Sequence, residues 1–459
     1  MYNNDTICAV STPPGTGGIA VIRVSGSEAF SVCNKLLAPR NGTEQNNLEL
    51  PSKPILRTIY LNDKPLDQVL ISVFHAPHSY TGEDTVEISC HGSLYIQQQI
   101  MQTLIECGAR QATAGEFTQR AFLNGKMDLS QAEAVADLIA STSEGMHRLA
   151  INQMRGGFSD ELQSLREQLL HFVSLIELEL DFSDHDDIEF VDRSELRALA
   201  IKLRDRIHTL ADSFSAGNAI KNGIPVAIIG KTNVGKSTLL NGLLNEDRAI
   251  VSDIPGTTRD TIEETLYING QLFRFIDTAG LRDNAADSVE ALGIRRSFEK
   301  AEKASVILYL FDLTQEDNED TVNISRWLHR YNKPVLMLGT KNDIARRSPI
   351  HTAGNVKAIH ISCLDKSDIE RVKQYIVSIA NVGKVSENDV IVSNIRHYEA
   401  LCRAGEAIDR VLAGLDEIPT DLLAEDIRDC LRHLAEITGG EITTNEVLAN
   451  IFSKFCIGK

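Results

Sequence analysis

Two kinds of hydrophobic spacing divide the chain into segments. Short continuous apolar runs, such as residues 224–229 and 334–338, predict buried strands. At 129–139 and 162–173, apolar residues recur every three or four positions, which predicts helices with one buried face. The pattern therefore predicts a mixed fold class that combines α/β segments and all-helical segments in one chain.

The first stretch, residues 1–124, is predicted to be an α/β domain. It carries expected strands at 19–24 and 86–89, a hairpin around 62–63 and a helix over 93–107. We expect this domain to precede the first helical stretch directly.

The remainder of the chain predicts an insertion. Residues 125–220 are helical, residues 221–379 return to an α/β pattern, and residues 380–459 are helical again. In the last stretch we expect helices over 391–415 and 422–437, the second stopped by two glycines. The α/β domain therefore interrupts a helical domain made of two separate pieces.

Composition narrows the class of protein. With 459 residues and 42% hydrophobic residues, two or three domains are expected. There is no apolar stretch long enough for a membrane span and no secretory pattern at the start, and the eight cysteines form no CxxC pair, so we expect a cytoplasmic protein. The net charge of −18 argues against broad nonspecific binding to nucleic acid, so a nucleic-acid contact needs a local basic patch or a basic partner.

Residues 230–237 read Gly-Lys-Thr-Asn-Val-Gly-Lys-Ser and fit the phosphate-binding loop G-x-x-x-x-G-K-S. A predicted strand leads into the loop and a predicted helix leaves it. In such a loop the backbone N–H groups and the helix N-terminus surround a phosphate. Lys236 then reaches the β- and γ-phosphates, and the Ser237 hydroxyl binds Mg²⁺.

The second motif, Thr340-Lys341-Asn342-Asp343, follows an apolar strand and is similar to the N-K-x-D element of GTPases. The Asp343 carboxylate can accept from the ring N–H and the exocyclic amine of guanine, a donor pair that adenine lacks. Thr340 stands where asparagine is usual. Its hydroxyl still offers a hydrogen bond, so we expect weaker guanine contacts with specificity retained.

Two further elements fit the γ-phosphate. Asp277 and Gly280, in Asp-Thr-Ala-Gly, suit a contact to the Mg²⁺ shell and a backbone N–H to the γ-phosphate, and Thr258 suits Mg²⁺. Asn269-Gly270 between two alternating runs predicts a hairpin. The expected GTP-contacting residues are Asn233, Val234, Gly235, Lys236, Ser237, Thr238, Ser252, Asp253, Ile254, Pro255, Gly256, Thr257, Thr258, Asp277, Thr278, Ala279, Gly280, Thr340, Lys341, Asn342, Asp343, Ser362, Cys363 and Leu364.

The residue after Asp-Thr-Ala-Gly is Leu281, where many GTPases place a water-orienting glutamine. Because leucine cannot polarise water, catalysis needs other groups. Asn233 and the loop before Thr257 indicate a monovalent cation, held by the Asn233 side chain and by backbone carbonyls near Ser252 and Ile254. Such a cation offsets charge that develops on the transferred phosphoryl group.

These motifs, together with Gly-Thr-Thr-Arg-Asp at 256–260 and Val-Glu-Ala-Leu-Gly-Ile at 289–294, resemble the MnmE family, also called TrmE, which comprises potassium-activated tRNA-modification GTPases. The resemblance covers the whole chain, including Cys-His-Gly at 90–92, the segment 115–126 and the ending Phe-Cys-Ile-Gly-Lys. It implies a Ras-like α/β GTPase domain and an N-terminal tetrahydrofolate-binding domain. Departures from the family pattern are Ser93, Thr232, Thr340 and Cys363, and none removes a phosphate or metal ligand.

The catalytic carboxylate is expected in the stretch after Leu281. Asp283, Asp287 and Glu290 are the candidates, and Glu290 aligns with the catalytic glutamate of the family if the preceding loop has one extra residue. That register shift leaves Asp287 as the alternative. We predict Glu290 because its longer side chain reaches further and because its expected task is to position water.

The resemblance also implies a one-carbon site in the N-terminal domain, which is the dimerisation domain of the family. The family's binding positions for 5-formyl- or methylene-tetrahydrofolate fall on Arg23, Glu87, Lys126 and Lys459. A carboxylate can pair with the pterin donors, and the glutamyl tail needs Arg or Lys. Cys456 is either a nucleophile toward a uracil or a structural or substrate-proximal thiol, and we favour the second.

The expected function is GTP hydrolysis coupled to tRNA modification. As a homodimer joined by a flavin-dependent partner, MnmG (also called GidA), in a heterotetramer, the family adds an aminomethyl or carboxymethylaminomethyl group to C5 of the wobble uridine (position 34) of certain tRNAs. The alternative is a regulatory GTPase switch in ribosome assembly. Such proteins usually carry an RNA-binding module, and no basic G-x-x-G segment is present here.

Overall fold

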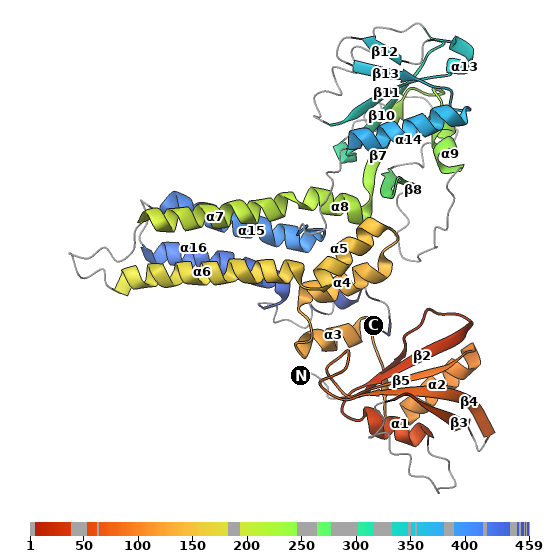
Figure 1. Cartoon of the computed structure of the whole chain (residues 1–459), viewed down its shortest axis with the longest axis vertical. Helices are drawn as coiled ribbons and strands as arrows, with labels where there is room; N and C mark the ends of the chain where they lie inside the picture. The colour runs from red at the N-terminus through yellow and green to blue at the C-terminus, as the bar shows by residue number, and fades with distance from the viewer. Residues whose placement is uncertain are drawn as a thin grey trace. The chain divides into compact units, whose positions relative to one another are not determined.

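Contacts divide the chain into two units (Figure 1). Unit 1 comprises Met1–Ala140, Ala150–Leu203 and Arg403–Lys459, and unit 2 comprises Ser141–Leu149 and Arg204–Cys402. The computed structural model describes residues 5–37, 53–61, 64–181, 193–245, 264–276, 302–315, 333–347, 350–353, 356–380, 390–415, 420–440, 448, 451–453, 455 and 457–458.

Unit 1 begins with a six-stranded sheet in the order β3-β4-β5-β2-β1-β6. The pairs are antiparallel except for β1 with β6. The strands predicted at 19–24 and 86–89 are confirmed as the adjacent β2 and β5, whereas the turn predicted at 62–63 lies outside the described residues, between β3 and β4. The strands are β1 (Ile7–Val10), β2 (Gly17–Ser25), β3 (Ile55–Leu61), β4 (Lys64–Phe74), β5 (Thr85–Gly92) and β6 (Arg110–Gln111).

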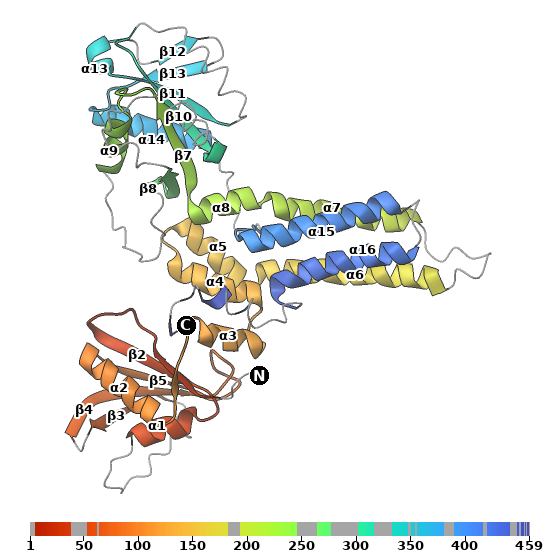
Figure 2. The same cartoon turned by 180° about the vertical axis from the view of Figure 1, so that it is seen from behind.

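The two faces of this sheet differ. Helices α1 (Ala29–Leu37) and α2 (Leu94–Glu106) cover one face, where they pack against alternate strand residues such as Ile22 and Ile88 (Figure 2). Helix α2 confirms the helix predicted over 93–107. Because side chains alternate across a strand, Arg23 and Glu87 belong to the other face. On that face Phe117, from α3 (Glu116–Leu123), packs with Ile7 and Ala9.

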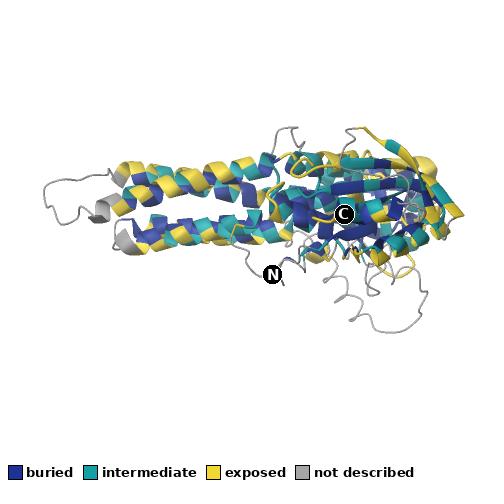
Figure 3. Cartoon of the chain, turned by 90° about the horizontal axis from the view of Figure 1, so that it is seen from below, coloured by how far each residue is buried: buried dark blue, intermediate teal, exposed yellow. Residues whose placement is uncertain are grey.

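Unit 1 also contains long helices. Helices α4 (Leu129–Ala140), α6 (Gly157–Asp181) and α16 (Thr420–Thr438) confirm the predicted helical periodicity, and α6 packs along α16. Buried residues line one side of the long helices and exposed residues the other (Figure 3). Helices α5 (Glu144–Met154), α7 (Arg193–Asp212) and α15 (Ile395–Gly414) each contribute residues to both units.

The last residues of the chain return to the N-terminal sheet. Ile457 forms an antiparallel bridge with Ala114, and the Ser11 hydroxyl donates to the Gly458 carbonyl over 3.1 Å. A Cβ at Gly115 would lie 2.7 Å from the Phe452 carbonyl oxygen, so only glycine allows the two segments to approach this closely. The C-terminal tail is therefore held beside the end of β1.

Unit 2 contains a seven-stranded sheet in the order β12-β13-β11-β10-β7-β9-β8. β9, β7, β10, β11 and β13 are parallel neighbours, and the outer strands β8 and β12 are antiparallel. Helices α8 (Phe214–Asn222), α9 (Lys236–Asn245), α13 (Asn342–Ala345) and α14 (Lys366–Ala380) accompany it. The strands are β7 (Ile224–Gly230), β8 (Glu264–Ile268), β9 (Gln271–Phe275), β10 (Val306–Asp312), β11 (Val335–Thr340), β12 (Ile350–Ala353) and β13 (Val356–His360).

Local sequence accounts for one turn of unit 2, whereas a distant contact sets the start of a helix. The hairpin predicted at Asn269-Gly270 is confirmed, and both residues have positive φ (50° and 77°), as a tight two-residue turn requires. The helix predicted from residue 391 is wrong at its start, because α15 begins at Ile395. The Ser213 hydroxyl accepts from the Val392 N–H, which holds the segment before α15, and the Asn394 side chain accepts from the Arg396 N–H and caps the helix.

Among the helices that the structure describes, none is both long enough and apolar enough to span a membrane.

Candidate functional site

The phosphate-binding loop joins β7 to α9 in unit 2. Asn233 and Gly235 have φ of 61° and 96°, so both occupy the left-handed region that turns the backbone around a central position. The Lys236 ammonium donates to the carbonyl oxygens of Gly230 (2.9 Å) and Lys231 (2.6 Å). The carbonyl groups of the loop thus hold the Lys236 ammonium at the position where a phosphate of the nucleotide is expected.

Thr340 ties the base motif to this loop. Its side chain is completely buried, and its hydroxyl lies 2.7 Å from the Val234 carbonyl oxygen and 3.1 Å from that of Phe311. The Cys363 sulfur would lie 3.6 Å from a Cβ placed on Gly235. The structure therefore brings the phosphate loop, the base motif and the loop at 362–364 together at the carboxyl ends of β7, β11 and β13.

Lys341 is held by a carboxylate that the sequence analysis did not select. Its ammonium lies 2.6 Å from Asp312, at the end of β10, whose side chain is 3% exposed. Burial alone would raise the pKa of Asp312, but hydrogen bonds from Lys341 and Thr314 outweigh it and hold that pKa below its usual value. The Asp312 carboxylate thus holds the side chain of Lys341, which belongs to the base motif.

Asp343 lines an open pocket of about 610 Å³, within the range of small-molecule sites. Asp368, in α14, accepts from the Ser362 N–H (2.8 Å), and the Ser362 hydroxyl accepts from the Leu364 N–H (3.3 Å). These bonds shape the far wall of the pocket. Its lining residues are Asn342, Asp343, Ser362, Leu364, Asp365, Lys366 and Asp368.

Cys363 stands next to this pocket but is not a nucleophile. Burial, together with the nearby carboxylates of Asp343 and Asp368, raises the pKa of its thiol to about 11. The thiol is therefore protonated at neutral pH and acts as a small apolar group between the loops.

Several predicted site residues lie outside the described residues. They are Ser252, Asp253, Ile254, Pro255, Gly256, Thr257, Thr258, Asp277, Thr278, Ala279, Gly280, Asp283, Asp287, Glu290, Cys456 and Lys459.

A second polar site lies on the open face of the sheet of unit 1. Arg23 in β2 and Glu87 in β5 are cross-strand partners, and the guanidinium donates twice to one Glu87 oxygen (2.7 and 2.9 Å). The rings of Tyr80 and Phe117 lie 5.1 and 5.6 Å from the guanidinium carbon. The Arg23 side chain is 12% exposed, yet its Nη1 is buried and has no hydrogen-bond partner among the described residues.

An unsatisfied N–H of a buried guanidinium is costly and indicates a missing acceptor. Glu87 retains a second oxygen and 28% exposure. The pair can therefore accept a ligand that offers both an acceptor to Arg23 and a donor to Glu87.

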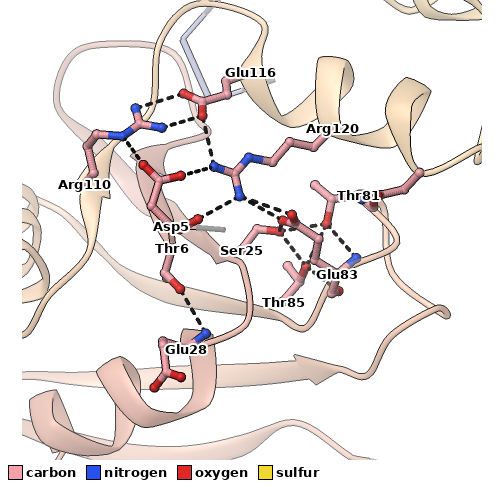
Figure 4. Close-up of polar contacts among 11 residues, drawn as sticks. Asp5, Thr6, Ser25, Glu28, Thr81, Glu83, Thr85, Arg110, Glu116 and Arg120 are labelled. Carbon is pink, nitrogen blue, oxygen red and sulfur yellow. Dashed lines mark hydrogen bonds and ion pairs between the residues drawn. The ribbon is translucent and has the colours of Figure 1, made fainter. Parts of the chain in front are cut away.

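Ion pairs centred on Arg120 support the loop that carries Tyr80 (Figure 4). The Arg120 guanidinium, 9% exposed on its side chain, donates to Asp5 (2.8 Å), Glu83 (3.1 Å) and Glu116 (3.1 Å). Arg110 donates to Asp5 and Glu116 as well. The network fastens α3, the chain start and the 80–85 loop to one another, which fixes the aromatic walls around Arg23.

Lys126, the third predicted folate residue, has other contacts. Its ammonium donates to the Pro77 carbonyl (2.9 Å), and its side chain would lie 3.3 Å from a Cβ on Gly82. It is thus held by the loop that carries Tyr80. The structure brings Arg23 and Glu87 into contact and places Lys126 against the neighbouring loop.

Sequence reasoning missed Asp312, Tyr80, Phe117 and Asp368. A signal existed for Asp312, because a polar residue ending an apolar strand at 306–312 marks the same sheet edge as Thr340. The two aromatic residues left no comparable pattern.

Comparison with known proteins covers the entire chain. The family model for the GTP-binding protein TrmE N-terminus matches residues 6–126, and the model for the MnmE helical domain matches residues 129–456.

Relatives named tRNA modification GTPase MnmE match over their full lengths. The protein of Parabacteroides distasonis is 55% identical over 99% of this chain, and that of Bacteroides fragilis is 53% identical over 100% of it. The protein of Flavobacterium johnsoniae is 50% identical, also over 100% of this chain. With both family models and full-length relatives in agreement, the chain belongs to the MnmE family of tRNA modification GTPases.

Proposed function

We propose that this chain, a GTPase acting in tRNA modification, works with a flavin-dependent partner to add an aminomethyl or carboxymethylaminomethyl group at C5 of the wobble uridine of certain tRNAs. A tetrahydrofolate one-carbon unit supplies the added carbon. The proposal includes a homodimer, a heterotetramer with the MnmG-type partner, and action in the cytoplasm. We also propose the domain limits 1–124, 125–220, 221–379 and 380–459.

The observation that carries the one-carbon part is the buried Nη1 of Arg23, which has no partner within the part of the chain that the structure describes. A pterin offers donors to the free oxygen of Glu87 and acceptors to the Arg23 N–H, so its chemistry fits the pair. The C-terminal tail, held next to β1 by Ser11 and Ala114, supports a contribution from Lys459 and Cys456 at the same sheet. Bound folate supplies the one-carbon unit, while Arg23 and Glu87 orient it.

The nucleotide part rests on the assembled loops of unit 2. Lys236 is positioned to exchange its two carbonyl partners for phosphate oxygens, and Asp343 is open to the pocket to accept from guanine. In this proposal the Ser237 and Thr258 hydroxyls hold Mg²⁺. Asn233, Ser252, Ile254 and Thr257 hold K⁺, and Glu290 positions water.

The first experiment is the nucleoside profile of tRNA from cells lacking this chain. We expect loss of the modified wobble uridine and its restoration by the wild-type gene. An unchanged profile together with accumulated ribosome precursors would instead support the assembly GTPase.

The second experiment compares GTP turnover in K⁺ and in Na⁺. We expect K⁺ to be required, because Leu281 cannot polarise water, and Asn233→Ala to lose the K⁺ response while it still binds GTP. Equal turnover in the two salts contradicts the cation site.

The third experiment is calorimetry of 5-formyl-tetrahydrofolate with the full-length protein. We expect binding by the wild type and its loss in Glu87→Gln. Absence of binding to the wild-type protein would end the one-carbon proposal.

A further inference from the structure

Asp67 and His91 form a polar pair where β4 begins and β5 ends. The Asp67 side chain is 6% exposed, and its two oxygens accept three hydrogen bonds. The donors are the His91 ring Nδ1 (2.6 Å), the His91 backbone N–H (2.9 Å) and the Gln68 backbone N–H (2.8 Å). The His91 side chain itself is 70% exposed. The buried Asp67 carboxylate thus orients the exposed imidazole ring of His91.

The carboxylate also selects the tautomer of His91. Because a carboxylate accepts hydrogen bonds and cannot donate them, the hydrogen of the neutral ring lies on Nδ1. The other ring nitrogen, Nε2, is then a hydrogen-bond acceptor on the exposed ring. An oriented acceptor of this kind suits a ligand with a single N–H donor.

His91 shares a sheet face with the Arg23 site. Glu87 and His91 are four residues apart on β5, which places them on one face and roughly 13 Å apart. The cross-strand partner of His91 is Ile19, which is 70% exposed. Directly opposed side chains lie close enough to contact one ligand. An acceptor and an apolar side chain therefore face solvent together on this face.

The surroundings of His91 are fixed by close backbone contacts. A Cβ on Gly92 would lie 2.4 Å from the Gly17 carbonyl oxygen, so the end of β5 is seated directly on the start of β2. The C-terminal tail reaches the same region, because Ser11 bonds both Gly458 and Val21, which lies between Ile19 and Arg23 on β2. The C-terminal tail thus contacts the sheet next to Val21, between Ile19 and Arg23.

We propose that His91 is the residue that recognises the target base, accepting a hydrogen bond from the N3–H of uracil through Nε2 while Ile19 contacts the ring. The inference rests on the proposed function and names the base-recognition residue of that reaction. Cytosine has a lone pair at N3 instead of N–H, so the same nitrogen rejects it. Asp67 is a positioning residue, because it acts through the ring of His91.

The test uses the full-length protein with its flavin-dependent partner, GTP, Mg²⁺, K⁺ and the folate donor. The substrate is an anticodon stem-loop with a wobble uridine, and the competitor is the same loop with cytidine. For His91→Phe, which keeps a flat ring and removes the acceptor, we expect KM for the uridine loop to rise about tenfold. We also expect the cytidine loop to become an equal competitor, with GTP hydrolysis unchanged.

Two variants separate recognition from structure. In Asp67→Ala the ring of His91 loses the acceptor that fixes its tautomer and its orientation, so we expect the preference for uridine over cytidine to fall. Tyr95, 60% exposed in the first turn of α2, serves as the control, because stacking does not distinguish bases. Tyr95→Ser is expected to leave the uridine-to-cytidine ratio unchanged.

A wild-type uridine-to-cytidine ratio in His91→Phe overturns the inference and leaves the proposed function intact. If the wild-type protein itself leaves the uridine loop unmodified, the proposed function fails, and the inference fails with it. His171→Ala, at an exposed histidine of α6, controls for the loss of an imidazole anywhere on the surface.

Discussion

The two candidate sites use their sheets in different ways. The nucleotide site lies at the carboxyl ends of parallel strands, where loops after β7, β11 and β13 supply its residues. The Arg23 site lies on the face of an antiparallel pair, and its two main residues are 64 positions apart in sequence. A strand-end site is built from contiguous loop residues, whereas a face site is built from alternate residues on separate strands. Only a strand-end site produces a contiguous motif that can be recognised in the sequence.

The comparison predicts that each site can be disabled without the other. The largest effect is expected for Glu290→Ala, which should lower kcat for GTP hydrolysis by about 10²–10⁴ while GTP affinity stays near normal. Folate binding should not change. The measurement is single-turnover hydrolysis next to calorimetry, with Asp287→Ala as the matched variant. If Asp287→Ala is the inactive one, the assignment moves to Asp287.

For the face site, Arg23→Lys tests geometry at constant charge. Lysine cannot reproduce the double donation to Glu87 or the position between Tyr80 and Phe117, so we expect folate affinity to fall about tenfold to a hundredfold. GTP turnover in the absence of RNA should equal that of the wild type. A parallel loss of turnover would show that the two sites are not independent.

The ion pairs behind the face site predict an acid-sensitive unit 1. A hydrogen bond from Arg110 lowers the pKa of Asp5, and bonds from Arg110, Thr113 and Arg120 outweigh the effect of burial and lower the pKa of Glu116. A carboxyl group whose pKa is lower in the folded than in the unfolded state stabilises the fold. This contribution is fully present at pH values above the unfolded pKa of about 4, and it is lost as the pH falls through the folded pKa.

We therefore expect the melting temperature of unit 1 to decrease once the pH drops below about 4. Glu116→Gln should have a lower melting temperature than the wild type at neutral pH, and its melting temperature should depend less steeply on pH in acid. Scanning calorimetry of the full-length protein measures both. An equally steep acid dependence in Glu116→Gln would exclude Glu116 as the source.

The smallest effect is expected at Thr340. Thr340→Val removes the hydroxyl that reaches the Val234 carbonyl and should weaken GTP binding roughly two- to tenfold. Thr340→Asn should tighten binding by a similar or smaller factor. Titration with a fluorescent nucleotide measures the dissociation constants of the wild type and the two variants. Identical constants for all three proteins would mean that the hydrogen bond from Thr340 to Val234 does not support the phosphate-binding loop.

Much of unit 2 was predictable because its signals are local. The apolar runs at 224–229 and 334–338, the turn at Asn269-Gly270 and the glycines of the phosphate loop each specify their own backbone. The start of α15 was not predictable in this way, since Ser213 holds Val392 from 179 positions away.

The face site shows the same limit more strongly. Arg23 and Glu87 were named through family resemblance, and nothing in the spacing of either strand indicates that they meet. Tyr80 and Phe117 reach Arg23 from a loop and a helix fixed by the Arg120 network, which is tertiary information. The Asp67–His91 pair was not predictable from the sequence either, because its two residues also meet only in the folded sheet.

The pairing of α6 with α16 has a consequence for synthesis. Glu177 and Arg428, which join these helices, are 251 residues apart. At a ribosomal rate of about 5–20 residues per second, α6 waits roughly 10–50 seconds for its partner, with the inserted domain emerging in between. During that time α6, whose buried residues include Leu162, Leu165 and Leu169, lacks α16, the helix along which it packs. A nascent chain halted just before α16 is therefore a natural client for a chaperone.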